Sequence, residues 1–377
     1  MKLKSKKYPF NEFLSQIKPI ELVIEKLFFH FFFLIRKINE RLAVSDGNIV
    51  IIALHKLGDT VFTIPAIREI KKHYNRKCII VCFSSSIPIY DLEFNDIEYC
   101  VVEHEDFWFQ ERIARRNIKK KLKSLKPHII FDLTGWVISV SLLISARAKC
   151  IIGTNNRKFR AIYDNFIEFR TSPTLADIYL DAISPVIKVL GEKVIRTKSE
   201  VSNPKGQILL HPYAGWEEKE WNLRKYILLA EGLSKSYSVC LIAPNNVVSP
   251  DIIQELTYLD IQFKQTQTTK ELIQVLHDCA LFIGNDSGPA NIANFLGKPT
   301  FTIFGSTSPN YIPHNFDFQK YNQLKLDCSP LENEKACIIG VDTYHCSGVQ
   351  CMNLLTLNEI LANVFPLINK YCQRMYD

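Results

Sequence analysis

Four short segments of the chain combine a glycine with side chains that can bind phosphate or take up a proton. They are HKLGDT (55–60), FDLTG (131–135), HPYAGWEEKEW (211–221) and GNDSGP (284–289). Glycine permits a tight turn, a carboxylate can act as a general base, and a lysine or a helix N-terminus can bind phosphate. These residue types predict a site that binds a phosphorylated substrate, with carboxylates at the ends of neighbouring strands.

The last two segments together predict a diphosphate site. Lys219 precedes one helical pattern, and Asp286, Ser287 and Gly288 precede another. Free backbone N–H groups and the helix dipole would hold the phosphates, and Lys219 would add a point charge. The alternative is helix capping, because Asp and Ser accept hydrogen bonds from N–H groups at a helix start. The same alternative applies to Asp59 in the first segment.

Several common chemistries leave no pattern in the chain. No G-x-x-x-x-G-K-[ST] and no G-x-G-x-x-G sequence occurs, so neither ATP hydrolysis nor NAD chemistry is indicated. No Asp-x-Asp pair occurs that would bring a divalent metal to a nucleotide sugar. We therefore expect protein groups alone to stabilise the phosphates, with no metal and no other cofactor.

A cluster of cysteines near the C-terminus leaves alternatives open. Cys328, Cys337, Cys346 and Cys351 lie near His345, but no pair has the C-x2-C spacing of a zinc knuckle. A metal site is the minority interpretation, and a loop packed by thiols or one oxidised pair is the other. The remaining cysteines lie singly in apolar runs, and no secretory signal pattern begins the chain, so we expect a reducing cytoplasm.

The segments around the four motifs alternate between strand and helix patterns. Short Val- and Ile-rich runs such as NIVIIAL (48–54) are each followed by a loop and a helical pattern, which predicts βαβ units in a parallel sheet. One such series precedes a polar stretch at 196–207, which we interpret as a linker, and a second follows it. The Lys- and Arg-rich stretch 111–126 is predicted to be helical. Two doubly wound halves would then face a shared crevice with the four motifs at strand ends.

Length and charge limit the class of protein. A chain of 377 residues suits two domains, and its net charge of +7 suits anionic small substrates or an anionic membrane surface. No stripe of Lys and Arg interleaved with aromatic residues runs through a domain, so nucleic acid is not a predicted partner.

The first 47 residues form a basic and aromatic extension. Lysines at 2, 4, 6 and 7 precede the apolar run 27–35, which only His30 interrupts. That run is too short for a bilayer, which needs about 20 residues. It is typical of a helix lying on an anionic lipid surface. The alternative is a helix packed on the protein or paired with another chain.

The ordered combination of longer motifs resembles a known family. LGDTVFTIPAIREIKK, FDLTGWVISVSLL, LLHPYAGWEEKEWNLRKYILLA and LFIGNDSGPANIANFLGKPTFTIFGSTSP together resemble glycosyltransferase family 9, the lipopolysaccharide heptosyltransferases. The resemblance extends from about Asn48 to the C-terminus. It implies an α/β protein with the GT-B fold, in which two Rossmann-like doubly wound domains face a central cleft. Residues 1–47 would be a helical extension, 48–200 an acceptor-binding domain, 201–355 a nucleotide-sugar-binding domain and 356–377 a C-terminal helix.

The resemblance also implies residue roles. Asp59 would be the catalytic base. The acceptor side would include Gly58, Asp132 and Thr134. The donor would be bound by Lys219, Asp286, Ser287, Gly288, Asn291, Tyr213 and Ala214.

Three of these positions depart from the family pattern. Asn291 stands where members usually carry a histidine, and Tyr213 and Ala214 stand where small hydroxyl residues are usual. The resemblance still implies metal-independent, inverting transfer of a sugar, with ADP-heptose as the expected donor and a lipid-anchored glycan of the lipopolysaccharide inner core as the acceptor. The enzyme would be cytoplasmic and peripheral on the inner face of the inner membrane, held there through its N-terminal segment. The alternatives are transfer of another nucleotide-activated sugar to a surface glycan, or a GT-B protein that binds a nucleotide sugar without catalysis.

Overall fold

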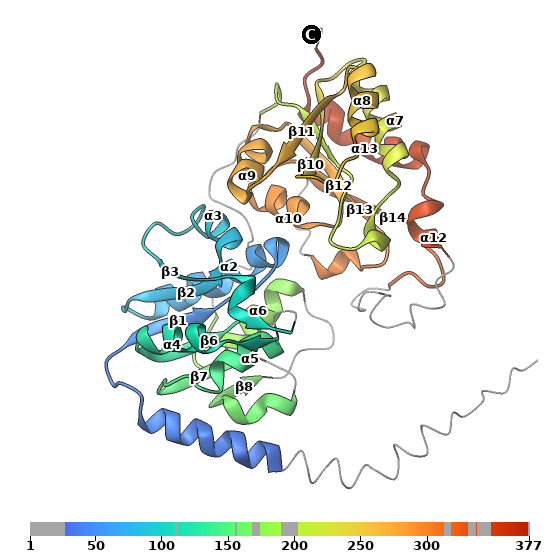
Figure 1. Cartoon of the computed structure of the whole chain (residues 1–377). Coiled ribbons are helices and arrows are strands. Elements are labelled where there is room, and N and C mark those ends of the chain that lie inside the picture. The colour runs from blue at the N-terminus through green and yellow to red at the C-terminus, as the bar shows by residue number, and fades with distance from the viewer. Residues whose placement is uncertain are drawn as a thin grey trace, which may run out of the picture.

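The computed structural model describes residues 27–375, apart from 110–111, 155–156, 168–173, 190–202, 313–317, 331–336 and 338–347. The chain folds into two α/β halves, with the blue-to-green first half below the yellow-to-red second half in Figure 1. Predictions that involve the lysines before residue 8, most of the linker at 196–207, His345 and Cys346 lie outside the described residues.

The first half is built on a six-stranded parallel sheet with the strand order β3-β2-β1-β6-β7-β8. The strands are β1 (Asn48–Ile52), β2 (Cys78–Phe83), β3 (Glu98–Val102), β6 (Pro127–Asp132), β7 (Cys150–Thr154) and β8 (Asn165–Ile167). Helices cover both faces of the sheet. This explains why the four residues of β1 after Asn48, which are Ile49, Val50, Ile51 and Ile52, are all apolar and fully buried.

Helices cover the two faces of this sheet. The helices α2 (Leu57–His73), α3 (Ile87–Tyr90) and α6 (Leu175–Ile183) pack on one face. The helices α4 (Arg116–Ser124) and α5 (Val137–Leu143) pack on the other. The parallel sheet and its flanking helices confirm the predicted βαβ organisation.

The predicted helix over 111–126 is wrong in its first part. A short antiparallel hairpin of β4 (Phe107–Trp108) and β5 (Ile113–Ala114) precedes α4, which begins only at Arg116. The backbone N–H of Ala114 donates to Ser141 Oγ on α5 at 2.8 Å. This tertiary contact holds the segment in a hairpin, and a local pattern of basic residues carries no sign of it.

The second half repeats the architecture of the first. Its parallel sheet has the order β11-β10-β9-β12-β13-β14. The strands are β9 (Ile208–His211), β10 (Val239–Pro244), β11 (Gln262–Thr266), β12 (Leu281–Asn285), β13 (Thr300–Phe304) and β14 (Gln319–Gln323). In each half the strand order is that of the doubly wound dinucleotide-binding fold, which confirms the predicted pair of Rossmann-like domains.

The helices of the second half are α7 (Leu223–Ser234), α8 (Pro250–Tyr258), α9 (Thr269–Asp278), α10 (Gly288–Phe295), α12 (Gln350–Asn353) and α13 (Leu357–Tyr371). The C-terminal helix α13 packs on this sheet through Ile360, Val364 and Ile368. Domain boundaries at 47/48, 200/201 and 355/356 stay predictions.

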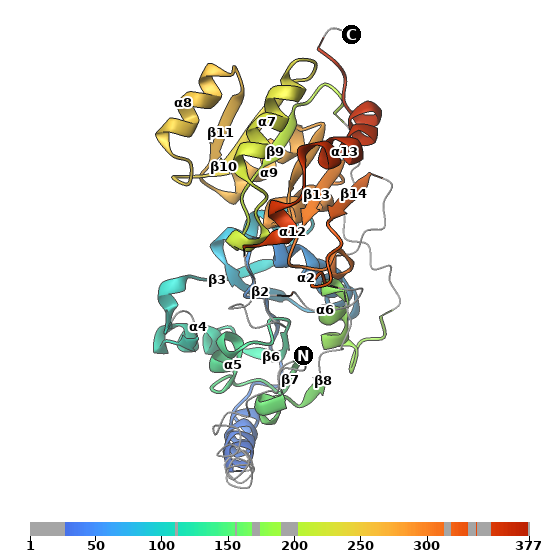
Figure 2. The same cartoon turned by 90° about the vertical axis from the view of Figure 1, so that its right-hand side faces the viewer.

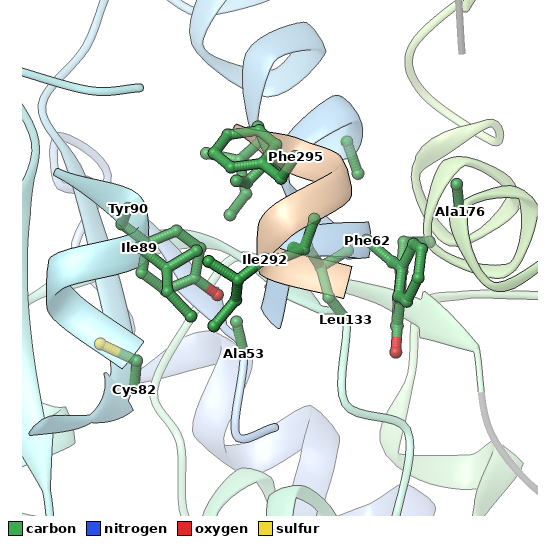
Figure 3. Close-up of a cluster of buried hydrophobic side chains, with 14 of the residues drawn as sticks. Ala53, Phe62, Cys82, Ile89, Tyr90, Leu133, Ala176, Ile292 and Phe295 are labelled. Carbon is green, nitrogen blue, oxygen red and sulfur yellow. The ribbon is translucent and has the colours of Figure 1, made fainter. Parts of the chain in front are cut away.

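The two halves share one hydrophobic core. Ile292 and Phe295 of α10 belong to the same buried cluster as Ala53, Tyr90 and Leu133 of the first half. Figure 3 shows α10 inserted among these side chains. Because α10 begins at the carboxyl end of β12 and packs against α2, this shared core brings the carboxyl ends of both sheets to the same place.

A helix over residues 27–41 lies at the end of the first half that is remote from the second half, in both views (Figures 1 and 2). The Arg36 guanidinium donates to Asp164 Oδ2 at 3.0 Å through Nε and to the Ala148 carbonyl at 3.0 Å. The side chain of Phe32 packs on the same core cluster as α4 and α5. Within the described residues, no helix is long and apolar enough to cross a bilayer.

Candidate active site

The N-termini of α2 and α10 meet where the two halves touch. A Cβ atom added to Gly58 would lie 2.9 Å from the Gly288 Cα, and one added to Gly288 would lie 3.2 Å from the Gly58 nitrogen. Glycine at both positions therefore permits the close approach of the two backbones. Because each helix presents free N–H groups at this end, two positive dipole ends converge on one point.

Asp59 lies at this junction, on the first turn of α2. Its side chain is half-buried, and no described residue donates a hydrogen bond to its carboxylate. The N-cap residue of α2 is Lys56, so the alternative that Asp59 is the N-cap is wrong. Burial raises the pKa of Asp59, while Lys219 lowers it, Asp286 raises it and Lys56 lowers it. A carboxylate of the first half is thus coupled electrostatically to two charged residues of the second.

Those two residues, Lys219 and Asp286, form a buried ion pair. Lys219 Nζ lies 2.5 Å from Asp286 Oδ2, and the two side chains are only 15% and 9% exposed. The Thr307 hydroxyl donates to the same carboxylate oxygen at 2.7 Å, and the Trp216 ring lies 4.4 Å from the ammonium group. These contacts fix one cation next to the start of α10. Thr307, in the GSTSP turn after β13, was not predicted as a site residue.

Asn285 holds the loop that carries Lys219. Its Oδ1 accepts from the Trp221 backbone N–H at 3.1 Å and from the Tyr226 hydroxyl at 3.0 Å, and its Nδ2 donates to the Pro212 carbonyl at 2.7 Å. Asn285 therefore ties the end of β12 to both ends of the 212–221 loop. This role was not predicted from the sequence, where an amide next to Asp286 at a strand end is its only signal.

Two polar side chains at the start of α10 are buried without a partner. Ser287 is the N-cap residue, but its hydroxyl makes no capping hydrogen bond. Ser287 Oγ and Asn291 Oδ1 have no hydrogen-bond partner among the described residues, although the two residues are only 7% and 8% exposed. Unpaired buried polar atoms are costly, so these atoms favour binding of a ligand over side-chain capping at this helix mouth.

A cavity of about 260 Å³ opens beside this helix mouth. Tyr213, Ala214, Ser287 and Gly288, four of the predicted donor-binding residues, line it. His211 lines it too and stays neutral near pH 7, because burial lowers its pKa to about 4. Lys219 and Asp286 lie outside this lining, and Asn291 lies one turn into α10.

The segment between β11 and α9 forms another wall of the cavity. It contributes Thr266, Gln267, Thr268 and Thr269. The Thr268 hydroxyl accepts from the Glu271 N–H at 3.2 Å and so caps α9. This segment was not predicted to be part of the site. Its T-x-x-E capping pattern directly after a strand was the available signal.

Asp132 and Thr134 do not fit the predicted contact with an acceptor. Asp132 has no exposed surface, and its carboxylate accepts from Tyr163 at 2.6 Å, from Ser139 at 2.8 Å and from the Thr134 N–H at 3.0 Å. The Thr134 hydroxyl accepts from the Leu54 N–H at 2.8 Å. Both side chains are used within the first half, where they shape the loop after β6 beside the loop that leads to Asp59.

We expect Asp132→Asn to lower the free energy of unfolding by about 2 to 4 kcal/mol, because an amide group would face hydroxyl and N–H donors. Ser139→Ala, which removes one donor and leaves the carboxylate, should cost about 1 kcal/mol. Urea unfolding at neutral pH measures both values. A change below about 0.5 kcal/mol for Asp132→Asn would show that this network does not support the loop.

Gly58→Ala is expected to lower kcat/KM of the reaction at this site by about tenfold to 100-fold, because its Cβ would push α10 away from α2 and misalign the two halves. Gly232→Ala is the matched control, since a Cβ at that position meets nothing within 4 Å. Steady-state kinetics of both variants provide the test. Unchanged kinetics in Gly58→Ala would mean that close contact between the two helix N-termini is not needed.

About half of the chain matches a known protein family. The model of the family described as "Glycosyltransferase family 9 (heptosyltransferase)" matches residues 155–341. The chain belongs to glycosyltransferase family 9. The matched range includes the loop with Lys219, the ion pair and the whole of α10.

Relatives of this family 9 protein are similar over most of its length. It is 23% identical over 300 residues to lipooligosaccharide heptosyltransferase 2 of Campylobacter jejuni, covering 76% of this chain and 85% of the relative. The structure of Escherichia coli ADP-heptose lipopolysaccharide heptosyltransferase II matches with a TM-score of 0.67 at 15% identity, covering 86% of this chain and 99% of that one. At this identity, the structural match supports the GT-B fold alone.

A third match is to a protein that is described as containing iron. TibC from enterotoxigenic Escherichia coli H10407 is described as an iron-containing dodecameric glycosyltransferase, and it matches with a TM-score of 0.50 at 11% identity, covering 87% of this chain and 78% of that one. In the family 9 protein, no group of three or more His, Cys, Asp or Glu side chains among the described residues could hold a metal. Cys328 is exposed, Cys337 is half-buried and Cys351 is buried. Metal independence stays a prediction.

Proposed function

We propose that the protein is an inverting glycosyltransferase that transfers heptose from ADP-heptose to an acceptor of the lipopolysaccharide inner core. The observation that carries the proposal is the coupling of Asp59 to the Lys219–Asp286 pair across the junction of two helix N-termini. Family membership supports the reaction class. The names of the relatives, which are lipooligosaccharide or lipopolysaccharide heptosyltransferases, support heptose as the sugar and the acceptor. The structural neighbour named as an ADP-heptose heptosyltransferase supports ADP as the nucleotide.

In the proposed mechanism, the Asp59 carboxylate removes the proton of an acceptor hydroxyl. The resulting oxygen attacks the anomeric carbon of the donor from the face opposite the diphosphate, and a new C–O bond forms. The bond from the anomeric carbon to the diphosphate oxygen breaks, and its electron pair leaves with ADP. The configuration at the anomeric carbon is inverted.

Stabilisation of the leaving diphosphate is assigned to groups of the second half. The free N–H groups and dipole of α10 would bind its negative charge, with Gly288 allowing close approach and the Ser287 hydroxyl supplying a donor. Lys219 would add a fixed positive charge in a nearly buried setting, where it is worth more than in water. The raised pKa of Asp59 makes it a stronger base than an ordinary carboxylate.

The donor is the part of this proposal most open to direct testing. Asn291 keeps a hydrogen-bonding side chain at the α10 mouth but cannot carry the charge of the usual histidine. Thermal unfolding with ADP, UDP and GDP should show stabilisation by ADP alone, because ligands that bind only the folded state raise the midpoint. Mass spectrometry of the product from ADP-heptose should then show one added heptose. Stabilisation by UDP or GDP in place of ADP would favour another nucleotide sugar, and ADP binding without product would favour a non-catalytic protein.

We propose in addition that transfer needs no metal. The cation beside the proposed diphosphate position is Lys219, which pairs with Asp286, and Thr307 donates to the same carboxylate. Enzyme treated with EDTA and re-purified should keep its full activity. Loss of activity on chelation and recovery with ferrous or magnesium ions would contradict this.

The helix over residues 27–41 supports a peripheral position on the inner face of the cytoplasmic membrane. Its outward stripe consists of Leu27, Phe31, Leu34 and Ile38, which are 66%, 58%, 61% and 51% exposed. These residues are three or four positions apart, so they form one apolar face, while Phe32 and Arg36 hold the opposite face to the protein. An apolar helix face lying outward is suited to the headgroup region of a bilayer.

Replacing Phe31, Leu34 and Ile38 together by Gln should reduce vesicle binding without unfolding the protein, because these side chains are exposed. The loss should persist at high salt, since the contact is apolar. Co-sedimentation with vesicles at about 0.1 M and about 1 M salt distinguishes this from an electrostatic contact. If the triple variant bound vesicles as well as the wild type at both salt concentrations, the helix face would not be a membrane contact.

A further inference from the structure

The outer face of α4 carries a concentration of positive charge that the proposed reaction does not use. Every charged residue between 112 and 126 is a lysine or an arginine. Ile118 and Leu122 turn inward and are buried. Arg116, Lys120 and Lys123 therefore fall on the opposite side of the helix, by the 3.6-residue period, and the half-buried Lys119 lies on its flank. Within the described part of the chain, none of these four has a carboxylate oxygen within 4.0 Å.

The β4–β5 hairpin directly before α4 presents an exposed apolar tip. Trp108, Phe109 and Ile113 are 52%, 75% and 44% exposed. Phe109 has a φ of 53°, a left-handed conformation that a bulky residue seldom adopts. A large aromatic side chain at such a position is neither buried nor favoured by the local backbone, so folding alone does not explain it.

The basic face and the apolar tip form one surface, which we call the basic–aromatic surface: Trp108, Phe109, Ile113, Arg116, Lys119, Lys120 and Lys123. The Arg115 guanidinium joins its two parts, because it lies 3.8 Å from the Trp108 ring centroid and its Nε donates to the Phe107 carbonyl at 3.4 Å. The hydrogen bond from Ala114 to Ser141 fixes the hairpin on α5. The surface is thus held in shape by the fold.

We propose that the basic–aromatic surface binds the anionic phospholipid headgroups of a membrane, with the hairpin tip inserted at the interface. Clustered lysines and arginines are attracted to an anionic leaflet, and each contributes about fivefold in affinity near the surface. Exposed Trp and Phe side chains are suited to the headgroup level. Single-stranded nucleic acid, whose bases stack on aromatic side chains, is the competing ligand, and the test below includes it.

The position of the surface agrees with the proposed membrane location but depends on other residues. Phe32 of the N-terminal helix and Ile118 and Leu122 of α4 pack in one core cluster on the same face of the first sheet. In Figure 2, α4 and the N-terminal helix both lie in the first half, away from the second half. The protein would therefore have two membrane contacts, one apolar and one electrostatic. The electrostatic contact does not depend on which sugar is transferred.

The test uses the full chain and vesicles of phosphatidylcholine, with or without about 30% phosphatidylglycerol. In one variant, Arg116, Lys119, Lys120 and Lys123 are replaced by Gln. Its matched control replaces Lys235, Lys264, Lys270 and Lys320 by Gln, which removes the same charge from exposed positions of the second half. A second variant, Phe109→Asn, removes the most exposed side chain of the apolar tip and suits the left-handed backbone.

We expect the α4 variant to bind anionic vesicles at least about 30-fold more weakly at about 0.1 M salt, and the matched control to change by less than about threefold. Phe109→Asn should bind the same vesicles roughly three- to tenfold more weakly at about 0.1 M and at about 1 M salt, because the contact that it removes is apolar. All variants should transfer sugar to a water-soluble, deacylated acceptor at the wild-type rate, so a failure of the proposed function would appear there and not in vesicle binding. Equal loss in the α4 variant and its control would overturn the proposal. So would wild-type binding that phosphatidylglycerol does not strengthen, because the apolar helix over residues 27–41 accounts for binding to neutral vesicles. Capture of RNA that vesicles do not displace would overturn it too.

Discussion

Asp59→Asn is expected to lower kcat for sugar transfer by about 10³-fold while changing ADP affinity by less than about twofold, since a general base typically contributes 10² to 10⁴-fold. The amide has nearly the shape of the carboxylate but cannot accept the acceptor proton. Asp59 belongs to the first half, whereas the residues assigned to the diphosphate belong to the second, so binding and chemistry should separate cleanly.

The control for this experiment is Glu69→Gln, which neutralises another half-buried carboxylate on the same helix. It should keep wild-type kinetics. Calorimetric titration with ADP and a single-turnover assay at saturating substrates separate binding from chemistry. Near-normal turnover by Asp59→Asn would rule out Asp59 as the base, and a parallel loss in Glu69→Gln would indicate a general effect of charge on α2.

Lys219→Met should have the second-largest effect, with kcat lowered by about 10² to 10³-fold, as when one preorganised donor to a transition-state charge is removed. ADP should bind more weakly as well, because Lys219 is assigned to the diphosphate in the ground state too. Asp286 is buried, and the variant removes the cation that neutralises it, so we also expect the protein to be less stable.

The loss of stability must be separated from the loss of catalysis. The double variant Lys219→Met with Asp286→Asn removes the unpaired charge and should recover much of the midpoint of thermal unfolding. It should not recover kcat, because the cation is still missing. Recovery of activity together with stability would mean that Lys219 acts only by supporting the fold. Lys235→Met, at an exposed position of α7's C-terminal end, serves as the unrelated lysine control.

The two sheets could be predicted from the sequence because parallel strands buried on both faces are apolar without interruption, as Ile49–Ile52 are. The start of α10 could be predicted equally well, since the sequence Asn-Asp-Ser-Gly-Pro at the end of a strand is typical of a helix N-terminus. Whether Ser287 caps that helix or faces a ligand could not be predicted, because the choice depends on a hydroxyl orientation. The structure leaves this hydroxyl unpaired.

Other parts of the site depend on contacts between residues remote in the chain. The pattern FDLTG gives no indication that Asp132 is enclosed by Tyr163 and Ser139, so a structural carboxylate resembled a binding one. The contact of Gly58 with Gly288 joins two halves of the molecule, and each glycine alone predicts only a turn. The hairpin before α4 was missed for the same reason, since its anchor is Ser141 on α5.

The central claim is that Asp59 acts as a base whose proton affinity is set across the junction by Lys219 and Asp286. The most direct test is the pH dependence of kcat/KM, which reports the ionisation of the free enzyme. Activity should fall on the acid side, as Asp59 becomes protonated, at a pH above that of an ordinary aspartate, because burial raises its pKa. This acid limb should move to higher pH in Lys219→Met, where a lowering charge is lost, and to lower pH in Asp286→Asn, where a raising charge is lost. An acid limb that stays in place in both variants would contradict the account.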